Sequence, residues 1–256
     1  METLILVILF GLVWGSFLNV LIYRVPRRLN IVVPPSACPE CGARIRPRDN
    51  IPVVSYAVLR GRCRGCGRPI PFRYPLVEIL TPGLFVVLLR ADGLTLHFFA
   101  SALFVSALIA LAFIDFDHKI LPDAITFPGA ALGLAYAFFR PDLTILQALL
   151  GAAVGAGFLL LLYGGYFLIR KKEGLGLGDV TMMAMIGIFL GWPRAVLTII
   201  LASFAGAAVG IAILVLKKKD LQFALPFGTF LAPAAFVALV WGDRIIAAYL
   251  SLYPKD

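Results

Sequence analysis

Four aspartates stand where long apolar segments give way to polar ones. Asp115, Asp117 and Asp123 lie in the stretch FIDFDHKILPD, directly after an apolar run over 98–112, and Asp179 ends the run GLGLGD. Carboxylates at such boundaries are either solvated loop residues or groups that face a protein interior or a wet cavity and have a function. If Asp115 and Asp179 face each other, they cannot both ionise easily and would share a proton. One could then take a proton from water while the other donates to a scissile carbonyl, which is the chemistry of an aspartic protease.

All four cysteines lie in two C-x-x-C-G motifs, Cys38 with Cys41 and Cys63 with Cys66, separated by 21 residues. Each motif can present two thiolates on one side of a tight turn, so the pair predicts a tetrahedral four-sulfur zinc site. The glycine after each motif is expected to allow close backbone approach. Two disulfides or free thiols are the alternatives, and a reducing cytoplasm disfavours the disulfides. Because four cysteines fill every coordination position, the zinc would be structural and would fold a segment with too small a core.

The histidines and the glycine-rich run do not predict a further catalytic or nucleotide-binding site. His97 and His118 are the two histidines; neither lies in a metal-binding spacing such as H-E-x-x-H, and they support no Ser-His-Asp set. The glycine-rich run over 174–179 lacks the Lys-Ser/Thr pair of a phosphate-binding loop, and no strand is expected before it. These patterns favour neither a metalloprotease nor a nucleotide-binding enzyme.

The elements that must position these residues are membrane helices. With 61% hydrophobic and 14% charged residues, the chain repeats apolar runs of membrane-spanning length, which predicts an all-α polytopic membrane protein. About eight spans are expected, at Leu4–Tyr23, Tyr74–Leu89, Leu94–Ile114, Ala124–Phe139, Leu143–Ile169, Val180–Leu190, Pro193–Leu216 and Leu221–Leu252. The sixth is too short to cross ~30 Å of hydrocarbon at ~1.5 Å per residue, so it is expected to begin below the membrane surface.

The Lys and Arg residues are distributed unevenly between the two sets of loops, and this bias predicts the topology. Eighteen of the 23 Lys and Arg residues lie in the loops at 24–73, 115–123, 170–179 and 217–220, and five lie elsewhere. Positive-inside bias therefore predicts that these loops are cytoplasmic and both termini outside, and it disfavours nucleic acid as the reason for the net charge of +9. Arginines follow the first span and no basic segment precedes it, so it is expected to be a retained anchor. The predicted parts are the first helix over 1–23, a cysteine domain over 24–73 and a seven-helix membrane core over 74–256.

A set of motifs runs through nearly the whole chain. GLVWGSFLNVLIYRVP, CPEC, NIPVVSY, RGRCRGC and RYPLVE come first, followed by IDFDHKILPD, GLGLGDV and PFGTFLAP. Together these motifs resemble those of type IV prepilin peptidases, bacterial members of the GxGD intramembrane aspartic proteases. GxGD alone would be a weak signal, but the combination is specific.

The resemblance implies a catalytic pair. In the family's first catalytic motif, an Asp precedes a Leu-Pro or Ile-Pro pair, with five residues between them. The GxGD motif ends in the second catalytic Asp. Mapped onto this chain, the catalytic residues are Asp115 and Asp179, and the supporting motif residues are Leu121, Pro122, Gly176 and Gly178. Asp117 and Asp123 match neither rule. Thr181 is a departure, because many relatives carry Lys at that position.

The resemblance also implies an activity and its partners. The expected substrates are prepilins and pseudopilins, cleaved at the cytoplasmic face of the bacterial inner membrane after a Gly between a basic leader and an apolar helix. S-adenosylmethionine is expected to methylate the new amino terminus. Glu78, inside the second predicted span, either stabilises a helix contact or an ion pair, or contributes to the methylation site. Membrane lipid surrounds such an enzyme, and an oligomer is compatible with the motifs.

Two other classes of protein compete with this interpretation. A membrane transporter could use the paired acids to relay protons or ions, although their position at the boundary disfavours it. A noncatalytic adaptor could use the zinc domain to dock a partner, and in that case Asp115 and Asp179 would be dispensable.

Overall fold

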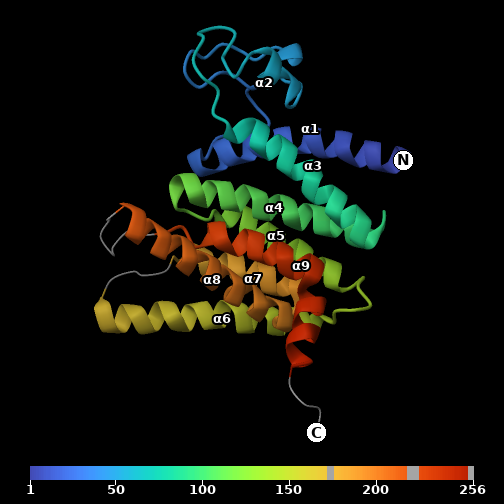
Figure 1. The fold of residues 1–256 in the computed structure, drawn as a ribbon, viewed down its shortest axis with the longest axis vertical. Coiled ribbons are helices and arrows are strands. Elements are labelled where there is room, and N and C mark those ends of the chain that lie inside the picture. The colour runs from blue at the N-terminus through green and yellow to red at the C-terminus, as the bar shows by residue number, and fades with distance from the viewer. Residues whose placement is uncertain (172–175, 218–224, 253–256) are drawn as a thin grey trace. The chain divides into compact units, whose positions relative to one another are not determined.

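The computed structural model describes residues 1–171, 176–217 and 225–252, and these are almost entirely helical. Figure 1 shows the helices, which are α1 (Glu2–Arg24), α2 (Val54–Val58), α3 (Arg73–Asp92), α4 (Leu96–His118), α5 (Asp123–Ala137), α6 (Ile145–Arg170), α7 (Leu177–Leu190), α8 (Trp192–Lys217) and α9 (Gly228–Leu250). Two short 3-10 turns lie at Val25–Arg27 and Pro47–Asp49. The described residues contain no strand beyond two isolated bridges, so the predicted all-α class is confirmed.

Six of the described helices are long and apolar enough to cross a membrane: α1, α3, α4, α6, α8 and α9. The predicted number of eight is therefore not confirmed. α5 and α7 have 15 and 14 residues, which is shorter than the ~20 that a perpendicular span requires. The predicted eighth span began at Leu221, but residues 221–224 lie outside the described residues and α9 begins at Gly228.

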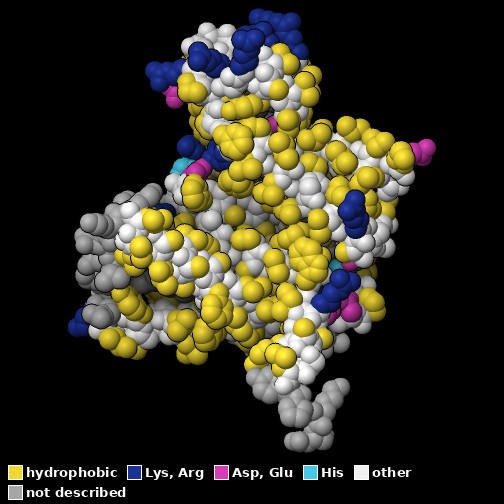
Figure 2. All heavy atoms as spheres, viewed as in Figure 1, with side chains coloured by type: hydrophobic (Ala, Val, Ile, Leu, Met, Phe, Trp, Pro, Cys, Tyr) yellow, Lys and Arg dark blue, Asp and Glu magenta, His cyan; other side chains and the backbone are white. Residues whose placement is uncertain are grey.

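Hydrophobic side chains cover the visible surface of these helices, while Lys and Arg side chains gather over the segment between α1 and α3 (Figure 2). Leu161, Leu168 and Ile169 of α6, for example, are 77%, 80% and 81% exposed. Exposed apolar side chains over whole helices are expected where lipid replaces water as the solvent. The chain is therefore a multi-pass membrane protein.

The chain forms two compact units, Met1–Ala110 and Leu111–Asp256. In the first unit, α1 and α3 pack closely through two glycines of α1. A Cβ atom on Gly11 would lie 2.6 Å from Cα of Pro82, and one on Gly15 would lie 2.9 Å from Cα of Glu78. Small residues one turn apart let two membrane helices approach in this way. The Nε1–H of Trp14 also donates to Oγ of Ser106, 2.8 Å away, and ties α1 to α4.

In the second unit, α7 lies at the centre and contacts α5, α6, α8 and α9 (Figure 1). Most of its residues are buried, including Met182, Met183 and Ile186. A Cβ atom on Gly151 of α6 would lie 2.1 Å from the carbonyl oxygen of Gly187, so glycine lets the two backbones touch. The helix that begins with the GxGD motif is thus held from several sides.

Candidate functional site

The second unit brings together the two aspartates that sequence reasoning nominated. Asp115 lies near the end of α4 and is 4% exposed, and Asp179 lies in the first turn of α7 and is 7% exposed. Their carboxylates are close enough for the charges to repel each other, and the backbone N–H of Gly228 interacts with both. Residues 64 positions apart in the sequence therefore form one buried acidic pair.

The N-terminus of α9 holds the Asp115 carboxylate. The backbone N–H of Thr229 donates to Oδ2 of Asp115 across 2.9 Å. The Thr229 hydroxyl lies 3.3 Å from that oxygen and 3.3 Å from the carbonyl oxygen of Ala112, and either can accept its proton. Free N–H groups and the helix dipole make a helix N-terminus a favourable place for an anion. Asp115 is thus oriented by a helix that begins more than a hundred residues later.

Asp179 has a different set of partners. Its Oδ2 accepts from the backbone N–H of Gly176 across 3.2 Å, which caps the first turn of α7. Its Oδ1 is buried and has no hydrogen-bond partner among the described residues. A buried carboxylate oxygen without a partner costs free energy, which a bound molecule could recover by forming a hydrogen bond to it. Oδ1 of Asp179 is therefore the atom of the pair best suited to contact a substrate or an attacking water.

Leu121 fits between two glycines and explains why neither can carry a side chain. A Cβ atom on Gly178 would lie 2.8 Å from Cβ of Leu121, and one on Gly228 would lie 2.9 Å from Cδ1 of Leu121. The same Cβ atom on Gly228 would also lie 2.9 Å from Oδ2 of Asp115. Contacts this short do not occur in folded proteins without displacement. The segments that contain Leu121, Gly178 and Gly228 thus pack together beside the acidic pair.

The remaining residues of these motifs surround the pair. Pro122 directly precedes the first residue of α5 and has extended backbone angles. Asp117 and Asp123 are both exposed and belong to neither position of the buried pair. The Thr181 hydroxyl donates to the carbonyl oxygen of Gly178 across 3.0 Å and lies 3.5 Å from Oδ1 of Asp123.

Sequence reasoning did not nominate Gly228 or Thr229 as site residues. Both lie in the motif PFGTFLAP, which supported the family resemblance without a role for any single residue. Their contribution is largely through backbone N–H groups, which every residue except proline has. Only the glycine within that motif, next to an expected helix start, could have pointed to them.

The four cysteines form a second cluster, in the first unit. Their Sγ atoms all lie within 4.8 Å of one another, and Cys38 Sγ is 4.0 Å from Cys66 Sγ. Four sulfurs about 2.3 Å from a central zinc would be separated by roughly 3.8 Å, so the cluster fits that ion. All four are free cysteines, and no disulfide joins them. The predicted alternative of two disulfides is therefore wrong for this structure.

The two C-x-x-C-G motifs have the same backbone hydrogen bonds. The N–H of Gly42 donates to the carbonyl of Cys38, and the N–H of Gly67 donates to that of Cys63, each across 2.9 Å. Both glycines have φ of +69°, and a Cβ atom on either would meet nothing within 4 Å. The glycines are thus needed for the left-handed backbone conformation. The prediction that they permit close backbone approach was wrong.

Neighbouring groups shift the pKa of several side chains in the cysteine module, residues 24–73. Backbone N–H groups of Cys66 and Gly65 lower the pKa of the Cys63 thiol to about 7, whereas desolvation and the neighbouring thiols raise the pKa of the Cys66 thiol to about 11. The Arg64 guanidinium beside Asp49 lowers the pKa of that carboxyl, and its Nη2 lies 2.8 Å from Oδ1. This ion pair joins the second cysteine motif to the turn at 47–49.

Glu78 lies at the junction of the module with the helices of the first unit. It is 9% exposed, and its Oε2 accepts from the backbone N–H of Val53 across 2.7 Å. The Ser16 hydroxyl also donates to this carboxylate. Within the described residues it has no basic partner, so one predicted role, an ion pair, is not found. Its Cα atom lies at the close contact of α3 with Gly15 of α1, and the role of its carboxylate stays a prediction.

Val53 adopts an unusual backbone conformation next to Glu78. Its φ of 62° and ψ of −47° form a γ-turn, with the N–H of Val54 donating to the carbonyl of Pro52 across 2.6 Å. A β-branched residue with positive φ is strained, and such strain often occurs at functional sites. The turn points the Val53 N–H toward the Glu78 carboxylate.

Comparisons with known proteins identify the family. Residues 9–91 match the model of the bacterial peptidase A24 N-terminal domain, and residues 102–211 match that of the type IV leader peptidase family. Proteins named prepilin leader peptidase/N-methyltransferase are similar to almost the whole chain. The one from Pseudomonas putida is 38% identical over 94% of this chain and 92% of its own, and the one from Pseudomonas aeruginosa is 39% identical over 95% and 92%.

A relative from Myxococcus xanthus with the same name is 47% identical over 80% of this chain and 61% of its own. No solved structure matches the chain. The resemblance inferred from the motifs is confirmed, because the matches cover both units and all of the motifs that carried it. The chain belongs to the type IV leader peptidase family.

Proposed function

We propose that this protein is an intramembrane aspartic endopeptidase that removes the basic leader of type IV prepilins and related pseudopilins. We also propose that it methylates the new amino terminus, because similar proteins are named prepilin leader peptidase/N-methyltransferase. The observation that carries the peptidase proposal is the buried pair of Asp115 and Asp179, which interact with each other and with one backbone N–H. Two buried carboxylates that interact with each other are the arrangement that aspartic proteases require.

The different surroundings of the two acids support different roles. Asp115 receives hydrogen bonds from the backbone and side chain of Thr229, which stabilise its ionised form. Oδ1 of Asp179 receives none within the described residues, so we assign the shared proton to Asp179. Asp115 would then take a proton from the attacking water while Asp179 donates to the carbonyl oxygen of the scissile bond. As the carbon–nitrogen bond breaks, a proton passes from the pair to the leaving amine.

The four-cysteine module is proposed to hold one structural zinc ion. Cys38, Cys41, Cys63 and Cys66 would supply its four ligands, because their sulfur atoms lie within 4.8 Å of one another and zinc accepts four thiolates. When bound, zinc supplies folding free energy to a segment with few buried apolar side chains, and no position remains open for a substrate.

The orientation in the membrane is also proposed. The cysteine module and the loops next to Asp115 and Asp179 belong to the set that holds eighteen of the 23 Lys and Arg residues. Positive-inside bias therefore supports a cytoplasmic position for the module and the acidic pair, with both termini on the other side of the inner membrane.

The test of the peptidase is an aspartate-to-asparagine comparison in purified protein. Asp115→Asn and Asp179→Asn each remove an ionisable group from the pair and should lower the rate of prepilin cleavage at least about 100-fold, the lower end of what general acid–base catalysis contributes. Asp117→Asn is the matched control, because this exposed residue lies on the same helix two positions away. Cleavage at the wild-type rate by either variant of the pair would exclude the mechanism.

A further inference from the structure

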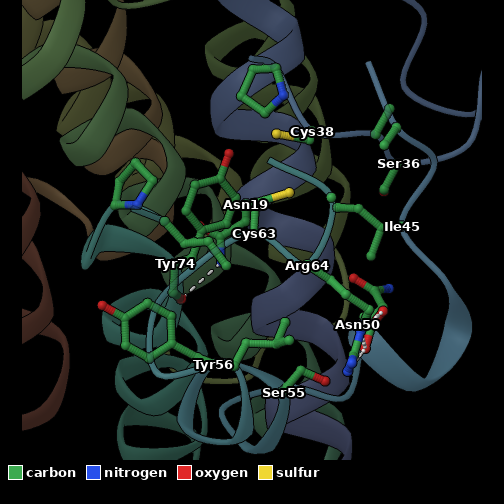
Figure 3. Close-up of a pocket in the computed structure, with 18 of the residues that line it drawn as sticks. Asn19, Ser36, Cys38, Ile45, Asn50, Ser55, Tyr56, Cys63, Arg64 and Tyr74 are labelled. Carbon is green, nitrogen blue, oxygen red and sulfur yellow. Dashed lines mark hydrogen bonds and ion pairs between the residues drawn. The ribbon is translucent and has the colours of Figure 1, made fainter. Parts of the chain in front are cut away.

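A pocket of about 310 Å³ lies inside the first unit, between the cysteine module and the ends of α1 and α3 (Figure 3). Asn19 and Glu78 line it from the two helices, and Tyr56 and Cys63 line it from the module. Its volume is at the lower end of the range of small-molecule sites, about 300–1,000 Å³. All residues that line the pocket belong to the first unit, whereas the acidic pair belongs to the second.

Asn19 provides an unused hydrogen-bond acceptor in this pocket. It is 3% exposed, and its Nδ2 donates to the carbonyl oxygen of Tyr74 across 3.0 Å. Only the NH₂ end of the amide can donate to a carbonyl, so this contact fixes the orientation of the side chain. Its Oδ1 is buried and has no hydrogen-bond partner among the described residues. An unpaired buried acceptor of this kind can be satisfied by a ligand with a donor or a positive charge.

Glu78 adds a negative charge to the same pocket. One of its oxygens is held by the N–H of the strained residue Val53, so the carboxylate is kept in place by backbone from the module. The pocket also has three tyrosines, whose rings suit a flat heterocycle or a cation: Tyr23, Tyr56 and Tyr74. Arg44, at the module side of the pocket, offers a positive charge to a carboxylate.

We propose that this pocket binds S-adenosylmethionine, with Asn19 and Glu78 facing its positively charged end. This inference rests on the proposed function, because a methyl donor is needed only if the chain methylates its product. When bound, the donor supplies a methyl group carried on a positively charged sulfur. The donor combines a cationic sulfonium and ammonium, a carboxylate and an aromatic base, and the lining offers acceptors, an arginine and tyrosines for these groups.

Binding of the labelled donor to the purified full-length protein, by equilibrium dialysis without peptide, tests the site apart from activity. Glu78→Gln keeps an oxygen for the Val53 N–H but removes the charge, and Asn19→Leu removes the unused acceptor together with the donor to the Tyr74 carbonyl. Each should weaken donor binding about 10-fold or more, since a hydrogen bond to a charged group contributes about 1.5–3 kcal/mol. Asp92→Asn is the matched control, an acid-to-amide change at the other end of α3 that should leave binding unchanged.

A second ligand tests whether charge is recognised. S-adenosylhomocysteine has a neutral sulfur in place of the sulfonium, so wild-type protein should prefer the methyl donor and Glu78→Gln should lose much of that preference. Prepilin cleavage by both variants should remain within about two-fold of wild type, because the acidic pair is unchanged.

Three outcomes would overturn the assignment in distinguishable ways. If wild-type protein methylates and both variants bind the donor normally, the pocket is the wrong site and the proposed function stands. If the variants bind the donor normally but bind the cleaved peptide weakly, the pocket recognises the amine of the substrate instead. If wild-type protein cleaves prepilin but neither binds the donor nor methylates, the methylation part of the proposed function fails together with this site.

Discussion

The backbone N–H of Thr229 donates to Oδ2 of Asp115 across 2.9 Å, joining the first residues of α9 to the end of α4. The neighbouring N–H of Gly228 interacts with both Asp115 and Asp179. The start of one helix therefore orients carboxylates from two others. This arrangement makes the motif PFGTFLAP part of the acidic site, and it predicts effects of substitutions that leave both acids in place.

Thr229→Val should remove the hydroxyl while leaving the backbone N–H that holds Asp115. Loss of one hydrogen bond to a charged group costs roughly 1.5–3 kcal/mol, so kcat should fall about 10-fold or more. KM should stay close to the wild-type value, because Thr229 is a positioning residue. Thr229→Ser restores the hydroxyl and should restore most of the rate. If Ser and Val variants have equal rates of prepilin cleavage, the hydroxyl has no role.

Gly228→Ala should place a methyl group 2.9 Å from Oδ2 of Asp115 and 2.9 Å from Leu121. Relief of these contacts must displace the carboxylate, and a displacement of about 1 Å can cost about 100-fold in rate. Gly206→Ala is the control, because its Cβ atom would lie 3.6 Å from Phe230, an ordinary contact distance. Cleavage assays measure the rates of both variants, and their unfolding temperatures show whether a lower rate is due to a loss of stability. Equal rates for the two variants would contradict the proposed crowding.

Some parts of the site could be predicted from sequence and others could not. The spacing of Cys38, Cys41, Cys63 and Cys66 predicts their cluster, because a C-x-x-C turn places two sulfurs together whatever surrounds it. Asp115 and Asp179 could be paired only through the family resemblance, since contact between them depends on how α4, α7 and α9 pack. The positive φ of Val53 and the donors on α9 have no residue-type signature. The apolar composition of α5 and α7 predicts two membrane spans. Both helices are too short, because each begins only at a polar motif.

Zinc content tests the four-cysteine module. We expect about one zinc per chain, and Cys38→Ser should lower this value and make the Arg-rich segment 24–73 more sensitive to trypsin, since structural zinc contributes roughly 10–16 kcal/mol in comparable sites. Lower pH should promote release, because protons compete with zinc for the thiolates. Glu40→Gln is the control within the same motif. Its carboxylate pairs with Arg68 at the surface, 3.1 Å away, and such exposed pairs contribute little.

Metal analysis and limited trypsin digestion of these two variants measure zinc retention in two independent ways. A Cys38→Ser protein with unchanged zinc content would show that the ion is not held by this cluster. A Glu40→Gln protein that loses zinc would show that the charge around the cluster, and not its sulfur ligands alone, controls retention.

Two glycines of α6 give a matched pair of substitutions that tests how α7 is held. A Cβ atom on Gly151 would lie 2.1 Å from the carbonyl oxygen of Gly187, whereas one on Gly157 would meet nothing within 4 Å. Gly151→Ala should therefore destabilise the protein by about 1–3 kcal/mol or more and also slow cleavage, because α7 begins at the GxGD motif. Gly157→Ala should be neutral or stabilise by up to about 1 kcal/mol, since alanine favours a helix interior. Thermal unfolding in detergent and prepilin cleavage measure both effects. Equal unfolding temperatures for the two alanine variants would rule out the close contact between α6 and α7.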